Sequence, residues 1–160
     1  MNESTGQIQA GAATHAGDDP RLALLCLPAT QQPAPIQTAL QELGYTVQLP
    51  AKPEDALEQI AQNRYELVLI HEAYGGSAEQ NQTLKAIQTM AMPLRRHMCI
   101  GLIGAQFKTS DHMMAFARSV HFVLAEADLG TIKTVARRAV TDNEHFYKAF
   151  RESLHEAGKE

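Results

Sequence analysis

The sequence predicts an α/β fold: a doubly wound, five-stranded parallel sheet with the strand order 2-1-3-4-5 and an extended C-terminal helix. Two observations lead to this prediction. Five short apolar runs alternate with five segments of helical periodicity from about residue 20 onward. The links between them are short, so each strand should be followed by a crossover helix and the next strand should run parallel to it.

The five apolar runs have the length and composition of buried strands. The first, RLALLCLP, is apolar on both alternating faces and is closed by Pro28, as expected of a strand covered on both sides. Gly101 weakens the fourth run without excluding it. The strands are predicted within residues 21–28, 45–50, 65–71, 97–105 and 121–128.

The segments between the strands repeat apolar residues at helical spacing and carry end signals. Gly44 is suited to end the first helix, Pro53 to begin the second, and Ser110 to cap the fourth. Acidic residues such as Glu126 and Asp128 are expected near helix starts, where they complement the helix dipole. The helices are predicted within residues 34–44, 52–63, 77–90 and 110–120, with a long last helix from about Leu129.

Composition and charge exclude several classes of function. The chain is 44% hydrophobic and 20% charged, as in soluble globular proteins, and its net charge of -4 does not favour nucleic acid or an anionic membrane as a partner. No segment approaches the apolar length of a membrane span, and residues 1–20 lack the apolar core of a signal peptide. We therefore expect a cytoplasmic protein. No CxxC pair occurs, so neither a cysteine-rich zinc site nor a cofactor is predicted.

The chain divides into three parts. Residues 1–19 are polar and rich in Gly, Ala and Thr, and we expect a flexible tail because such a segment buries too little apolar surface to offset its ordering entropy. Residues 20–141 carry the strand–helix alternation, and residues 142–160 form a helical extension.

The element order, the spacing and the strand YELVLIH, which ends at His71, resemble the receiver domain of bacterial response regulators over about residues 21–141. The resemblance implies a flavodoxin-like, CheY-like fold. It also implies an acidic pair after the first strand to hold Mg²⁺, a phosphoryl-accepting Asp after the third, Thr or Ser after the fourth, and Lys after the fifth. The matching positions in this chain hold other residues: Cys26 and Leu27, His71, Gly104 or Ala105, and Ala125-Glu126-Ala127.

These replacements remove the chemistry of phosphorylation. Mg²⁺ requires hard oxygen ligands, which the thiol of Cys26 and the side chain of Leu27 do not supply. The resemblance therefore implies a pseudo-receiver that is not an enzyme. Such a chain would act in bacterial signalling or regulation as a protein-interaction module. We expect His71 at a strand end near solvent rather than in the core.

Two alternative functions remain open from the sequence. The first is a ligand or metal sensor, in which Cys26 and His71 meet at the sheet edge where open α/β sheets bind ligands, either as soft-metal ligands or with an activated thiolate. The second is an enzyme of unrelated chemistry on the same scaffold. No Ser-His-Asp set and no carboxylate pair indicates catalysis.

The C-terminal segment continues past the point near Thr141 where the last receiver helix ends. An inner apolar stripe is predicted at Ile132, Val135, Ala136, Ala139 and Val140. Helical spacing of apolar residues then continues beyond it at Phe146, Tyr147, Phe150 and Leu154. Either the chain folds back at the polar stretch TDNEH, or the extension packs on another chain. We favour the second alternative, with a homodimer or an unidentified regulatory protein as the partner.

Overall fold

A computed structural model describes residues 20–158 and contains one five-stranded sheet in which all neighbouring strands are parallel. The strand order is β2-β1-β3-β4-β5, so the predicted fold class and topology are confirmed. The predicted tail, residues 1–19, lies outside the described residues. The strands are β1 (Leu22–Cys26), β2 (Thr46–Gln48), β3 (Leu67–His71), β4 (Cys99–Gly104) and β5 (Phe122–Ala125).

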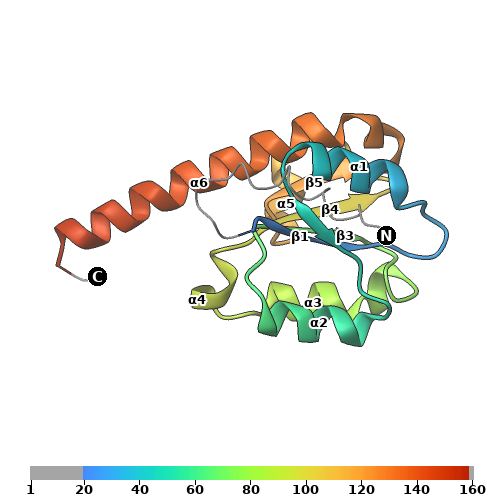
Figure 1. Cartoon of the computed structure of the whole chain (residues 1–160), viewed down its shortest axis with the longest axis horizontal. Coiled ribbons are helices and arrows are strands. Elements are labelled where there is room, and N and C mark those ends of the chain that lie inside the picture. Colours follow the sequence, from blue (N-terminus) through green and yellow to red (C-terminus); the bar gives the residue numbers. More distant parts are fainter. Residues whose placement is uncertain (1–19, 159–160) are drawn as a thin grey trace, which may run out of the picture.

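Helices cover both faces of the sheet (Figure 1). Side chains on β3 alternate between the two faces: Val68 and Ile70 pack toward α2 and α3, whereas Leu67 and Leu69 pack toward α1 and α6. The helices are α1 (Ala34–Glu42), α2 (Pro53–Gln62), α3 (Gln82–Gln88), α4 (Met92–Arg95), α5 (His112–Ala117) and α6 (Ile132–Glu156), with 3₁₀ turns η2 (Ala78–Gln80) and η3 (Glu126–Thr131).

Two predicted helix starts are wrong. Asp111, not Ser110, caps α5, because its carboxylate accepts a hydrogen bond from the Met114 N–H at 3.1 Å. Ser110 has a φ of 66°, and its own N–H donates to the carbonyl of Val123. An N-cap normally has extended backbone, so this left-handed residue cannot fill that role. The third predicted helix starts later than expected, since Asn81 caps α3 through the Leu84 N–H at 2.9 Å.

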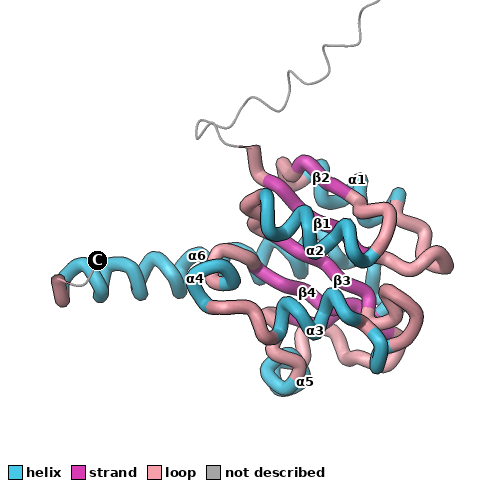
Figure 2. Tube along the Cα trace, turned by 90° about the horizontal axis from the view of Figure 1, so that it is seen from below, coloured by secondary structure: helices cyan, strands magenta, loops and turns pink. Residues whose placement is uncertain are grey.

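The last helix also departs from the prediction. Residues Glu126–Thr131 form the 3₁₀ turn η3, and α6 begins only at Ile132. From there α6 continues without interruption for 25 residues, so the fold-back alternative is wrong. The predicted inner stripe is confirmed: Ile132, Ala136 and Val140 are buried, and Val135 and Ala139 pack against the same core. Beyond this stripe α6 extends away from the rest of the molecule (Figures 1 and 2).

Arg21 contacts both a residue beside the sheet and a residue in the middle of α6. Arg21, just before β1, donates from Nε and Nη2 to Glu66 Oε1 at 3.0 and 2.7 Å, and from Nη2 to the Tyr45 hydroxyl at 3.1 Å. The same Nη2 lies 3.9 Å from a carboxylate oxygen of Glu144 on α6. The last buried residue of α6, Val140, lies one turn before this contact, so the helix leaves the core near Glu144.

Candidate functional site

The residues that the resemblance assigned to a phosphorylation pocket lie at one edge of the sheet. Cys26, His71, Gly104 and Ala125 are the last residues of β1, β3, β4 and β5, and Leu27 follows Cys26. The strand register aligns them, with His71 opposite Ile103 and Gly104 opposite Ala125. Parallel strands present their carboxyl ends together, so this edge is where a ligand-binding crevice is expected in an open α/β sheet.

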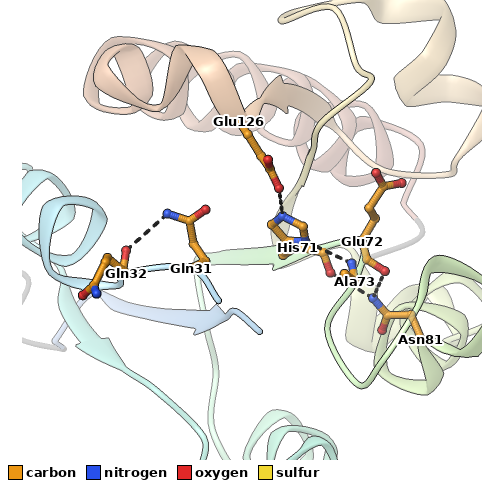
Figure 3. Close-up of polar contacts among 7 residues, drawn as sticks. All are labelled: Gln31, Gln32, His71, Glu72, Ala73, Asn81 and Glu126. Carbon is orange, nitrogen blue, oxygen red and sulfur yellow. Dashed lines mark hydrogen bonds and ion pairs between the residues drawn. The ribbon is translucent and has the colours of Figure 1, made fainter. Parts of the chain in front are cut away.

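His71 is buried at this edge, with 5% of its surface exposed, so the expectation that it lies near solvent is wrong. Its Nδ1 accepts a hydrogen bond from the Ala73 N–H at 3.0 Å, and its Nε2 contacts Glu126 Oε2 (Figure 3). Because Nδ1 accepts, it carries no proton, and Nε2 must donate to the carboxylate. The imidazole is therefore the neutral Nε2–H tautomer, with both ring nitrogens satisfied.

Glu126 is the residue that contacts His71 Nε2. From the sequence it was interpreted as a helix-start acid and as part of the segment that stands where the resemblance implies a lysine. It is the first residue of η3, directly after β5, and lies 55 positions from its partner. The resemblance implies a lysine in this region of the chain, so the polarity is reversed: a histidine holds the acceptor position and a carboxylate follows β5. No pattern in the sequence around either residue indicates the His71–Glu126 pair, because the two residues come together only when the sheet places the ends of β3 and β5 near each other.

Asn81 is a second residue that the sequence did not single out. Its side chain is fully buried, and its Nδ2 donates to the carbonyl oxygens of His71 at 3.0 Å and Glu72 at 3.1 Å (Figure 3). Its Oδ1 accepts from the Leu84 N–H. The amide thereby joins the end of β3 to the start of α3 and fixes the backbone that carries His71 and Glu72.

The space above the end of β4 is filled by side chains. A β-carbon added to Gly104 would lie 2.5 Å from Glu72 Oε2 and 2.7 Å from Cε2 of the Phe107 ring. The resemblance implies Thr or Ser here, yet either side chain would collide with Glu72 unless that carboxylate moved. The absence of a side chain at Gly104 thus leaves room for Glu72 and Phe107, which lie where the side chain of a Thr or Ser would project.

Cys26 does not meet His71. It packs with Leu24 and Ile70 on the α2–α3 face of the sheet, whereas alternation along β3 directs His71 to the opposite face. Burial raises the pKa of the Cys26 thiol to about 12, so the thiol stays protonated at neutral pH. This geometry does not support the alternative in which Cys26 and His71 meet as a pair with an activated thiolate. Within residues 20–158, moreover, no group of three His, Cys, Asp or Glu side chains is arranged to hold a metal ion.

The Mg²⁺ site of receivers does not fit these residues either. The thiol of Cys26 is buried and protonated, and Leu27 offers no side-chain oxygen. Mg²⁺ prefers oxygen ligands in octahedral geometry. The side chains of Cys26 and Leu27, at the positions that would hold the cation, supply no oxygen ligand.

The predicted interaction residues lie on the projecting part of α6. We call Phe146, Tyr147, Phe150 and Leu154 the extension surface. Phe146 is 62% exposed and Phe150 38% exposed, while Tyr147 and Leu154 are half-buried. Tyr147 contacts both phenylalanine rings edge-on, with ring centroids 5.0 Å from Phe146 and 6.1 Å from Phe150. Three aromatic rings thus form one continuous apolar patch.

Comparisons with known proteins identify the fold but no family. No family model matches the chain, and no curated protein matches it. Among solved structures, a CheY-like receiver domain from Methanospirillum hungatei superposes with a TM-score of 0.61 at 12% identity, covering 79% of this chain and 98% of that one. A response regulator from Thermotoga maritima gives 0.59 at 10% identity, with 77% and 99% covered.

A third similar structure is a fusion that contains the trimeric coiled coil of yeast Spc42; it gives a TM-score of 0.61 at 22% identity, covering 87% of this chain and 89% of that one. These similarities establish a CheY-like receiver fold. Within residues 20–158, no helix combines the length and the apolar character that crossing a membrane requires.

Proposed function

We propose that the chain is a non-phosphorylatable, receiver-like protein-interaction module that serves bacterial signalling or regulation in the cytoplasm, without catalysis, as a homodimer formed through α6. The observation that carries this proposal is the extension surface: an uninterrupted helix leaves the core and presents Phe146 and Phe150 to solvent. A contiguous exposed apolar patch is a feature that monomers avoid and interfaces use.

The geometry at the carboxyl edge of the sheet supports the absence of phosphorylation. The acceptor position holds His71, whose ring is already hydrogen-bonded on both nitrogens. The carboxylate of Glu126 covers it, and a second carboxylate, Glu72, lies over Gly104. An incoming phosphoryl dianion would meet the carboxylates of Glu72 and Glu126 at this edge, which is electrostatically unfavourable.

Dimerisation follows from the energetics of the extension surface. Fully burying an exposed side chain of this size contributes roughly 1.5–3 kcal/mol, so Phe146 on each of two helices, with smaller contributions from the partly exposed Phe150, Tyr147 and Leu154, favours association. A two-fold axis pairs identical surfaces and is the commonest solution for a self-complementary patch.

Light scattering on the purified protein tests this proposal. We expect a dimer in the wild type and a monomer when Phe146→Glu and Phe150→Glu are combined. Lys148→Glu is the matched control: it also lowers the net charge by two but projects from the polar side of α6. A wild type that stays monomeric at high micromolar concentration would contradict homodimerisation and direct the search to a different regulatory protein as partner.

A further inference from the structure

A cluster of basic side chains lies at the opposite edge of the sheet from His71, where α6 leaves the core. Arg64 precedes β3, Arg96 and His97 follow α4, and Arg151 lies on the projecting part of α6. These four side chains line one cleft of about 470 Å³. We call it the basic cleft.

The side chains of the basic cleft are in contact or in electrostatic reach of one another. Arg64 Nη2 lies 2.7 Å from Nδ1 and 3.1 Å from Nε2 of His97, so the guanidinium is held against the imidazole ring. The pKa of His97 is lowered, first by partial burial and then by the positive charges of Arg64, Arg96 and Arg151. His97 is therefore a neutral acceptor at pH 7, surrounded by three cations.

The charges of this cleft are not balanced within the described chain. Glu66 and Glu144 also line it, but both face Arg21, at 2.7 and 3.9 Å. Among residues 20–158, no carboxylate lies within ion-pair distance of Arg64, Arg96 or Arg151. Glu152 and Glu156 line a neighbouring cleft with Arg96 and Arg151, but among the described residues neither lies within ion-pair distance of them. The three arginines near His97 therefore have no paired carboxylate in this part of the chain.

Such an arrangement has the chemistry of an oxyanion site. Guanidinium groups present forked N–H donors that match the oxygens of phosphate, and they stay charged at every physiological pH. Like charges held close together repel one another, and a multivalent anion between them removes this cost. Arginine also suits partly exposed positions, because its weakly hydrated group loses little on contact with a ligand.

We propose that the basic cleft binds a small multivalent oxyanion of the phosphate class, held by the guanidinium groups of Arg64, Arg96 and Arg151 beside His97. The site lies at the amino-terminal edge of the sheet, away from the positions that resemble a phosphorylation pocket. Because Arg151 belongs to α6 and the other two arginines belong to the core, the bound anion bridges the projecting helix to the sheet. The proposal does not depend on dimerisation.

Binding and protonation of His97 must be linked. An anion that neutralises the three arginines removes the repulsion that disfavours the imidazolium, so it should raise the pKa of His97. By reciprocity, protonation of His97 should strengthen anion binding by the same factor. Glu66, Glu144 and Tyr147 also line the cleft, and they are unchanged in every variant below.

The test is an NMR titration of the His97 ring with sodium phosphate and, in a second arm, sodium tripolyphosphate, each against sodium chloride at equal ionic strength. We expect saturable binding and an upward shift of the His97 pKa in both phosphate arms. If tripolyphosphate binds more tightly, the site is suited to a phosphate chain; if the two are equal, a single phosphate group is the ligand.

Matched variants complete the test. Arg96→Gln combined with Arg151→Gln should weaken binding at least tenfold, whereas Arg137→Gln combined with Arg138→Gln changes net charge equally outside the cleft and should leave binding unchanged. Circular dichroism checks that both variants are folded. The proposal is overturned if chloride shifts His97 as much as phosphate does, or if the two variants lose binding equally.

Discussion

His121 and Ile100 exchange two hydrogen bonds between β4 and the residue that precedes β5. The Ile100 N–H donates to Nδ1 of the His121 ring at 2.9 Å, and the His121 N–H donates to the Ile100 carbonyl at 2.8 Å. The imidazole thus replaces a backbone acceptor at the end of the sheet ladder. Since Nδ1 accepts, the ring must be neutral to keep this contact.

This relationship predicts acid sensitivity. Burial, and secondarily the charge of Arg95, lowers the pKa of His121 to about 4, whereas the unfolded chain titrates near 6.5. The unfolded state therefore binds a proton first, and stability should fall as pH decreases from about 6.5 to 4, by about 3 kcal/mol in total. Urea unfolding of the wild type and His121→Asn across this range measures the effect. An unchanged pH slope in the variant would contradict it.

The end of β3 should tolerate loss of the His71 side chain better than a reversal of its charge. His71→Ala removes the hydrogen bonds to the Ala73 N–H and to Glu126, whose side chain is 38% exposed and can be hydrated instead, so we expect a loss of about 1–3 kcal/mol. His71→Asp places a third carboxylate beside Glu126 and Glu72 and should cost more at pH 7. Urea unfolding compares the two, and equal stability of both variants would show that the Glu126 contact is unimportant.

Leu69→Asp is the severe reference for this series. Leu69 is fully buried between β1 and β4, where an unpaired charge has no access to water. We expect this variant to lose the folded state under conditions in which His71→Ala remains folded, as followed by circular dichroism.

Phosphodonors should not modify the carboxyl edge of the sheet. We expect no saturable, Mg²⁺-dependent change in the amide spectrum on addition of acetyl phosphate or beryllofluoride, because neither Cys26 nor Leu27 can ligate the cation. His71→Asp alone should not restore the reaction for the same reason. A saturable change centred on residue 71 in either protein would refute this prediction.

Gly101 should be intolerant of even a methyl group. An added β-carbon would lie 2.2 Å from Cζ of Phe122 and 2.7 Å from Cδ2 of Leu69, inside a core that is closed on both sides. We expect Gly101→Ala to cost about 1–3 kcal/mol through overpacking. Gly130→Ala is the matched control, because a β-carbon there meets nothing within 4 Å. Thermal unfolding of both variants separates the two effects: a lower melting temperature for Gly101→Ala alone indicates overpacking, whereas similar changes in both variants would indicate an effect on chain entropy.

Gly101 also illustrates which features of the fold could be predicted from the sequence and which could not. Gly101 weakens β4 as a strand by propensity, yet it is the residue that lets the Phe122 ring lie against β4. Alternating apolar and amphipathic segments indicated a parallel, doubly wound sheet, since each crossover is local in sequence and has a fixed hand, and 2-1-3-4-5 is a common order for five such strands. Contacts between distant segments, such as His71 with Glu126, carry no periodic signal and appear only once the sheet is assembled.

Helix ends likewise depend partly on features that the sequence does not show. Ser110 and Asp111 are both good N-cap residues by type, and only the backbone decides between them. Ser110 has left-handed backbone, and its N–H donates to the carbonyl of Val123 in β5. The continuity of α6 through TDNEH was also undetermined, because polar residues neither break nor require a helix. The inner stripe was predicted correctly because it repeats at helical spacing against a single buried face.

The projecting helix turns small displacements at the core into large ones at its end. From Val140, the last buried residue, to Glu156 the helix spans about 24 Å at 1.5 Å per residue. A tilt of about 10° at its root would therefore carry its tip through about 4 Å, enough to bring side chains into or out of contact. The Arg21–Glu144 contact lies near the root of this helix. A change that breaks or strengthens this contact would therefore displace the end of α6, far from the sheet.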